Sequence, residues 1–361
     1  MTPITVQRPT PERVSQHLRE RLEKSAIRSL TPHEESLLKS EGPQAFVLKQ
    51  LLSKNFRKWS VNPDTQKNIA RAVDIAVRDQ KPLRLVHPMG GYKIWRLPSA
   101  PEVDWAEFFS MAHMLHYLSG IAAAYAPGVH LQYFMYTLLP QRHDNLPADD
   151  VQRYVDSFQV LLDAFGKHLP PNVKLSIVRE DDFYSREEYF SLLDERYEMI
   201  APGFNDFPES QRKILLTCSR QNIKWMGAED WTRLAEAEKD EKVLRGAVYE
   251  MVGNFTMDRT AEFLVGEDKI MVFVSRGPSN IGIGSTKSSR AKFWIGTGVL
   301  EDRGGELYDT VLTPGQVERI AEAPRSLIEP GLLPLRNLGS VQVIHQHLDF
   351  SQPSGPLLGT G

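Results

Sequence analysis

Two glycine-containing segments, each carrying lysine, are the parts of the sequence best suited to chemistry. In the first, "GGYK", Gly90, Gly91 and Tyr92 lead to Lys93. Bare backbone amides beside an ammonium group suit a phosphate or a carboxylate, and we expect them to bind substrate. The spacing fits neither the dinucleotide-binding fingerprint nor the P-loop. A plain tight turn explains the segment equally well, so both interpretations stay open.

The second segment, "SRGPSNIGIGSTKSSRAKFWIGTG", holds five glycines and five serines among residues 275–298. Its amides, hydroxyls and positive charges predict an anion site, with an exposed basic hairpin as the alternative. The substrate-binding residues expected here are Arg276, Ser285, Thr286, Ser288 and Lys292. Because a doubly charged phosphate needs more than one cation, we expect Lys287 and Arg290 to act in catalysis with Lys93, in one shared cleft.

Other titratable residues have weaker claims on a site. Asp104 and Glu107 could do acid–base chemistry, although complementing a helix dipole explains them at least as well. His345, His347 and Asp349 alternate along a predicted strand with a spacing that permits a metal ion. Edge-strand histidines without a nearby third ligand are commoner, so we expect no metal and no cofactor.

The elements that must position these residues alternate from residue 83 onward. Apolar runs predict strands at 83–89, 129–135 and 173–180, with amphipathic helices between them. Such alternation is typical of an α/β fold with a mostly parallel, doubly wound (Rossmann-like) sheet. Ligands of these sheets bind at the carboxyl ends of the strands, where Lys93 falls. Later glycine-separated strands, "AKFWIGTG" among them, predict antiparallel C-terminal additions to the sheet.

The chain divides into three expected parts. Residues 1–81 form a basic helical extension, in which Thr31 and Glu34 have the spacing of a capping box. Residues 82–350 form the α/β catalytic domain, and residues 351–361 a flexible tail. The first part holds 15 Lys and Arg against 9 Asp and Glu, a net charge of +6, whereas the other 280 residues carry −9. Either an anionic partner or ordinary solvated helix faces explain this asymmetry.

Composition limits the class of protein. The 361 residues are 41% hydrophobic and 25% charged, as in ordinary globular proteins. No apolar run approaches the ~20 residues that span a bilayer, so we expect no membrane partner. The single cysteine, Cys218, fits a reducing compartment and a buried helix position. With no secretory signal pattern at the start, we expect a cytoplasmic protein.

The order of motifs resembles the amino-acid isonitrile (isocyanide) synthases of the pyoverdine/dityrosine biosynthesis group. The likeness rests on "LVHPMGGYK" and on "APEVDWAEFFSMAHMLHYLSGIAAAYAPGVHLQY". In that family a strand leads to a lysine loop, a Pro-x-x-Asp-x-x-Glu helix start and a Tyr-x-Pro-Gly turn. The matching residues here are Pro101, Asp104, Glu107, Tyr125, Pro127 and Gly128.

A second stretch carries the resemblance further along the chain. Lys292 and Phe293 are similar to the family's Lys-Phe strand, and Thr313 and Pro314 to its Thr-Pro turn. The likeness covers about 83–180 and 270–316. There are three departures. Thr286 stands where the family has a histidine, "FMYTLL" replaces its aspartate-glycine after the second strand, and the first loop reads differently around Lys93. These departures bear on the reaction rather than on the fold.

The resemblance implies a biosynthetic transferase or lyase that acts on an amino acid or its derivative, with a phosphorylated sugar as second substrate. Two other functions stay open. An aminoacyl-tRNA-dependent transferase would use the basic helices to bind tRNA, and its binding would depend steeply on salt. A non-catalytic small-molecule-binding protein would lose no chemical activity when the site charges are removed.

Overall fold

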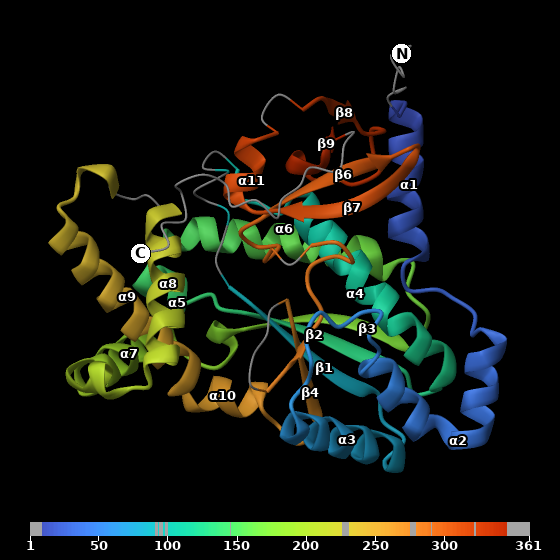
Figure 1. Ribbon diagram of the computed structural model, residues 1–361, viewed down its shortest axis with the longest axis horizontal. Helices are drawn as coiled ribbons and strands as arrows, with labels where there is room; N and C mark the ends of the chain where they lie inside the picture. Colours follow the sequence, from blue (N-terminus) through green and yellow to red (C-terminus); the bar gives the residue numbers. More distant parts are fainter. Residues whose placement is uncertain are drawn as a thin grey trace.

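The computed structural model describes residues 9–90, 93, 97, 100–144, 146–225, 231–274, 279–289, 291–320 and 323–344. A parallel sheet lies at the centre, with a lobe of helices on one side and a second, smaller sheet near the first helix (Figure 1). The α/β fold class predicted from the sequence is confirmed.

Five parallel strands form the central sheet in the order β3-β2-β1-β4-β5. They are β1 (Leu83–Met89), β2 (Val129–Met135), β3 (Val173–Arg179), β4 (Lys269–Phe273) and β5 (Ile281–Gly282). β1 pairs in parallel with β2 along its whole length and with β4 on its other side. The strand order changes direction at β1, which makes a switch point between β1 and β4 where sheets of this kind bind ligands.

One face of this sheet packs against α4 (Trp105–Ala124) and α6 (Ala148–Gly166). α4 is buried on nearly every side because it also touches the second sheet. The closest approach is at Gly298, where an added Cβ would lie 2.2 Å from the carbonyl carbon of Trp105. Only glycine fits at that position, so the second sheet is held tightly against the start of α4.

The opposite face of the central sheet is covered near its carboxyl end by α10 (Asp258–Leu264). Leu264 packs with Val86 of β1 and Phe134 of β2 in a small apolar cluster. Nearer the amino ends of the strands this face is polar, and His130 and Ser176 bond to each other across neighbouring strands at 2.8 Å. The covered part of this face is therefore the part next to the strand ends.

Three helices precede the sheet, as the sequence predicted: α1 (Pro11–Lys24), α2 (Pro32–Leu51) and α3 (Pro63–Arg78). The predicted capping box is confirmed, with Thr31 and Glu34 bonding each other's backbone at the start of α2. Gly42 has a φ of 80° and kinks that helix. Apolar side chains from all three helices belong to the same core as the central sheet.

Between β3 and β4 the chain builds a helical lobe. We use that name for α7 (Arg186–Ile200), α8 (Glu209–Trp225) and α9 (Glu236–Phe255), together with the short α5 (Leu139–His143) that follows β2. The lobe has an apolar core of its own. It is tied to the sheet by Glu180, whose carboxylate accepts the amide protons of Leu138 at 2.7 Å and Leu139 at 2.9 Å. Short 3-10 turns occupy 180–182, 201–206, 231–233 and 336–338.

The C-terminal strands form a separate four-stranded sheet in the order β7-β6-β9-β8. They are β6 (Thr297–Arg303), β7 (Glu306–Leu312), β8 (Arg325–Leu327) and β9 (Ser340–Ile344), with α11 (Pro314–Glu318) after β7. The antiparallel pairs expected here exist, β6 with β7 and β8 with β9, whereas β6 and β9 run parallel. These strands do not extend the central sheet, which grows instead by the parallel β4 and β5.

The strand predicted for "AKFWIGTG" is wrong over its first six residues, because β6 begins only at Thr297. The carbonyl of Lys292 accepts the amide protons of Ile295 at 3.2 Å and Gly296 at 2.9 Å, which closes a turn, and β6 begins only afterwards. Phe293 and Trp294 are adjacent and both buried. Neighbouring strand residues point to opposite faces, so a turn is the conformation that lets both rings enter the core.

Candidate active site at the carboxyl ends of the strands

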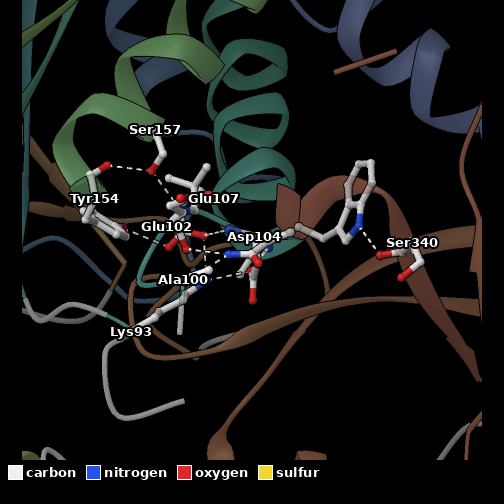
Figure 2. Close-up of polar contacts among 12 residues, drawn as sticks. Lys93, Ala100, Glu102, Asp104, Glu107, Tyr154, Ser157 and Ser340 are labelled. Atoms are coloured by element: carbon white, nitrogen blue, oxygen red, sulfur yellow. Dashed lines mark hydrogen bonds and ion pairs between the residues drawn. The ribbon is translucent and has the colours of Figure 1, made fainter. Parts of the chain in front are cut away.

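Lys93 lies beyond the carboxyl end of β1, and its ammonium group is held between two carboxylates at the start of α4 (Figure 2). Its Nζ is 2.6 Å from Asp104 Oδ1 and 2.6 Å from Glu107 Oε2. The Lys93 and Glu107 side chains are fully buried, and Asp104 keeps 12% exposure. Buried charges persist only where they are paired, so the three groups form one unit.

The same two carboxylates begin α4. Asp104 is the N-cap, and its Oδ1 accepts the amide proton of Ala106 at 2.6 Å, while Glu107 accepts the amide proton of Asp104 at 2.8 Å. This capping box fixes both carboxylates relative to the helix. Stabilising the helix start and holding Lys93 are therefore combined in one pair of residues.

Tyr154 of α6 completes the cluster from the neighbouring helix. Its hydroxyl donates to the second oxygen of Glu107 at 2.9 Å (Figure 2). Burial raises the pKa of Glu107, although the nearby Lys93 ammonium acts in the opposite direction. A carboxyl group with a raised pKa is a candidate for proton transfer. We call Lys93, Asp104, Glu107 and Tyr154 the Lys93 cluster.

The partners of Lys93 correct one expectation. Its charge is already matched by Asp104 and Glu107, so the ammonium does not wait unpaired for an anionic substrate. Packing also explains why residue 90 is glycine, because a Cβ there would lie 3.2 Å from the Tyr136 ring. Of the site residues predicted in the two segments, four lie outside the described part of the chain: Gly91, Tyr92, Arg276 and Arg290.

The serine-rich segment uses its hydroxyls to fold itself. Ser285 donates to the carbonyl of Ala291, and Thr286 Oγ1 accepts the amide proton of Ser289 at 3.0 Å. Ser288 donates to the Asp309 carbonyl on β7 at 3.1 Å.

Lys287 has surroundings of its own. Its side chain is exposed, and its carbonyl accepts a hydrogen bond from Lys58. The cleft that Lys287 is expected to share with Lys93 stays a prediction.

Lys292 has an aromatic neighbour in its own segment. Its Nζ lies 5.9 Å from the centre of the Trp294 ring. Burial raises the pKa of Glu250 on α9 and of Cys218 on α8, and the Lys292 charge opposes both shifts. His345, His347 and Asp349 lie outside the described residues, among which no group of His, Cys, Asp and Glu could hold a metal ion.

Two buried polar side chains also lie near the carboxyl end, on paired positions of β1 and β2. His87 and Tyr133 face each other with ring centres 5.6 Å apart. Burial lowers the pKa of His87 to about 4, so the ring is neutral at physiological pH. Its Nδ1 lies 3.1 Å from the Pro88 carbonyl and must carry the proton. His87 Nε2 and the Tyr133 hydroxyl have no hydrogen-bond partner in the described part of the chain.

Several of these residues were missed from the sequence. Tyr154 stands 47 residues from Glu107 on an amphipathic helix, where nothing marks it as polar core. His143 and Asp144 did carry a signal, because a histidine beside an aspartate soon after a predicted strand is a candidate acid–base pair. Glu250 lies in a charged helical sequence that gives no indication of burial.

A parallel sheet with this strand order is an open α/β fold. In folds of this class, ligands bind at the carboxyl ends of the strands, which is where the polar side chains lie in this chain. Neither a family model nor a curated protein sequence matches the chain. Among solved structures, the chain is similar to the PvcA protein from Pseudomonas aeruginosa, with a TM-score of 0.62 and 14% sequence identity. The match covers 84% of this chain and 99% of PvcA, which establishes a shared fold. None of the helices in the described residues is long and apolar enough to cross a membrane.

Proposed function

We propose that this chain is a cytoplasmic, isonitrile-synthase-like enzyme of small-molecule biosynthesis that acts on an amino acid or an amino-acid derivative. The motifs around Lys93, Asp104 and Glu107 resemble that family, and the fold likeness to PvcA over 99% of its chain points the same way. The observation that carries the proposal is the meeting of these three motif residues in one buried acid–base cluster beyond a strand end.

The proposed chemistry needs a base and a carbon donor. An isonitrile contains one carbon more than the amine it comes from, so a second substrate must supply that carbon, and the resemblance implies a phosphorylated sugar. Forming the isonitrile also requires removal of protons from the substrates. Glu107, whose pKa is raised by burial, is the group that would take up a proton, and Lys93 and Tyr154 hold its two oxygens in place.

Product analysis tests this function. The purified protein is incubated with each common amino acid and a panel of pentose and hexose monophosphates, and any isonitrile is trapped with a tetrazine and weighed by mass spectrometry. We expect one amino acid to yield a product that has gained one carbon. Glu107→Gln should slow its formation roughly 10²–10⁴-fold, as removal of a general base does.

A matched control separates the site from general effects on charge. Glu187 is an exposed glutamate on α7, and Glu187→Gln should leave turnover unchanged. Absence of isonitrile from every substrate pair would contradict the proposed function. Binding of an amino acid without any turnover would favour the non-catalytic alternative.

The tRNA-dependent alternative gains little from the N-terminal helices. Several of their basic side chains are paired with carboxylates of the chain itself: Arg21 with Asp309, Arg28 with Glu34 and Arg71 with Glu267. Pairing reduces the positive field that would attract RNA phosphates. A band shift with bulk tRNA that weakens steeply with salt would revive this alternative.

A further inference from the structure

A second buried charged cluster lies in the helical lobe, between α5 and α9. His143 Nδ1 is hydrogen-bonded to the carboxylate of Asp144, and these side chains are only 3% and 8% exposed. The other ring nitrogen, Nε2, is buried without a hydrogen-bond partner among the described residues, and so is Oε2 of Glu250. Leaving a buried polar group unpaired costs about 1–3 kcal/mol, so two such groups in one region call for an explanation.

The two unpartnered atoms lie at the same face of α9, one of them on α9 itself and the other on α5. A Cβ added at Gly246 would lie 3.0 Å from His143 Nε2 and 2.3 Å from the Ser219 hydroxyl, so the ring packs closely on α9 only because residue 246 is glycine. Glu250 stands four residues further along the helix, on the face that Gly246 presents to His143. The imidazole and the carboxyl group therefore lie on the same side of α9, where that helix packs against α5.

A third charge approaches from outside the lobe. Lys292, in the turn before β6, lies close enough for its ammonium to favour the ionised form of Glu250. Burial by itself lowers the pKa of His143, but the adjacent Asp144 carboxylate, with smaller contributions from Glu250 and from the backbone of Gly246, outweighs it and the pKa rises to about 9. At neutral pH the region thus contains two cationic donors, His143 and Lys292, beside one carboxyl group with an unused oxygen.

We infer that His143, Asp144, Glu250 and Lys292, here called the lobe site, bind the α-ammonium and α-carboxylate groups of the amino-acid substrate. This inference rests on the proposed function. Glu250 Oε2 accepts from the ammonium, His143 Nε2–H and the Lys292 ammonium donate to the carboxylate, and Asp144 holds the imidazole protonated. A zwitterion satisfies both unpartnered atoms at once, whereas a simple anion would leave the Glu250 oxygen unpaired and add to its charge.

Calorimetric binding with three related ligands tests each half of the site. The common amino acids are titrated first, and the tightest binder is then compared with its des-amino acid and with its decarboxylated amine. Glu250→Gln should weaken binding of the amino acid and of the amine roughly 10-fold to 100-fold and leave binding of the des-amino acid unchanged. Lys292→Met should weaken binding of the amino acid and of the des-amino acid by a similar factor and leave binding of the amine unchanged.

Matched variants control for folding and for general charge. Glu241→Gln on α9 and Lys213→Met on α8 change exposed residues of the same lobe and should not alter binding of any of the three ligands. Lys292→Arg keeps the charge and should retain binding of the des-amino acid. It keeps the test decisive even if Lys292→Met fails to fold.

The outcomes separate the lobe site from the proposed function. If the wild type binds an amino acid and neither Glu250→Gln nor Lys292→Met changes affinity in the stated ligand-selective way, the lobe site is wrong and the proposed function stands. If the wild type binds none of the amino acids, both are contradicted. The lobe site is supported if Glu250→Gln selectively loses affinity for the ammonium-bearing ligands and Lys292→Met selectively loses affinity for the carboxylate-bearing ligands.

Discussion

The Lys93 cluster and the lobe site are both buried and charged, but they differ in how completely their polar atoms are paired. In the Lys93 cluster, Glu107 accepts hydrogen bonds at both oxygens, and Lys93 donates to two carboxylates. In the lobe site, His143 Nε2 and Glu250 Oε2 have no hydrogen-bond partner in the described part of the chain.

This difference predicts a division of labour. A fully paired network holds its members in one geometry, and removing any member exposes an uncompensated charge to an apolar surrounding. A network with unused donors and acceptors lowers the stability of the free protein, and a ligand that pairs with those atoms restores it. Substitutions in the Lys93 cluster should therefore lower stability in addition to any effect on turnover, whereas those in the lobe site should act mainly on binding.

The largest effect on stability is expected from Lys93→Met. It leaves the Asp104 and Glu107 carboxylates buried together without a cation, so the free energy of unfolding should fall by about 3–5 kcal/mol. Urea unfolding measures this change. Lys67→Met removes an exposed lysine that pairs with Asp64 at 3.0 Å, and should stay within about 0.5 kcal/mol of wild type. Equal effects of the two substitutions would show that the cluster is not a paired unit.

The next effect is a pH dependence that originates in His143. Its pKa is raised from 6.5 to about 9 in the folded protein, so its stabilising contribution is complete below pH 6.5 and is lost as the pH rises through 9. His143→Gln should remove a fall in unfolding free energy of up to about 3 kcal/mol across that range. Asp144→Asn should remove it as well, because the carboxylate causes the shift. If the unfolding free energies of wild type and variants change in parallel from pH 6 to 9, the pH dependence does not originate in His143.

Tyr154→Phe should have a smaller effect. It deletes a hydrogen bond of 2.9 Å to the buried Glu107 carboxylate, which should cost about 1.5–3 kcal/mol. The protein contains an exposed counterpart in Tyr308, which donates to Glu306 at 2.6 Å on the surface of β7. Tyr308→Phe should change the unfolding free energy by less than about 0.5 kcal/mol, because water replaces the lost partner. A Tyr154→Phe variant as stable as Tyr308→Phe would mean that Glu107 does not depend on this bond.

The smallest effect is expected from Tyr133→Phe. The Tyr133 hydroxyl is buried and has no hydrogen-bond partner among the described residues, so its removal breaks no bond and ends the cost of burying an unpaired polar group. The free protein should be unchanged or more stable by up to about 1 kcal/mol. Together with Tyr154→Phe, this substitution compares the same chemical change at a paired and an unpaired position. A loss above about 2 kcal/mol would show that the hydroxyl has a partner.

The parts of the fold that repeat a local pattern could be predicted from the sequence. Apolar runs identified β1, β2 and β3, and alternation with helices indicated their parallel pairing. The end of "AKFWIGTG" was a strand as expected, but its aromatic residues are also what a turn buries, and local sequence does not distinguish the two. Whether later strands join the first sheet or form another depends on long-range packing, such as the approach of Gly298 to Trp105.

In the candidate site, too, the locally spaced residues could be predicted from the sequence, whereas the long-range contacts could not. Lys93, Asp104 and Glu107 are near one another in the sequence and were noticed, yet their pairing depends on the path between β1 and α4 and was not foreseen. Glu250 meets His143 from more than a hundred residues away, and Lys292 comes from a third region of the chain. These residues became candidates for a site because they are buried, and burial of a charged residue cannot be predicted from the local sequence.

The most direct test of the contrast between the two clusters is a crystal structure with the tightest-binding amino acid. The account predicts the ligand ammonium within hydrogen-bond distance of Glu250 Oε2 and its carboxylate beside His143 Nε2 and Lys292 Nζ. The Lys93 contacts to Asp104 and Glu107 should remain at about the 2.6 Å of the free protein. A ligand bound to Lys93 in place of those carboxylates, with the lobe site unchanged, would contradict the account.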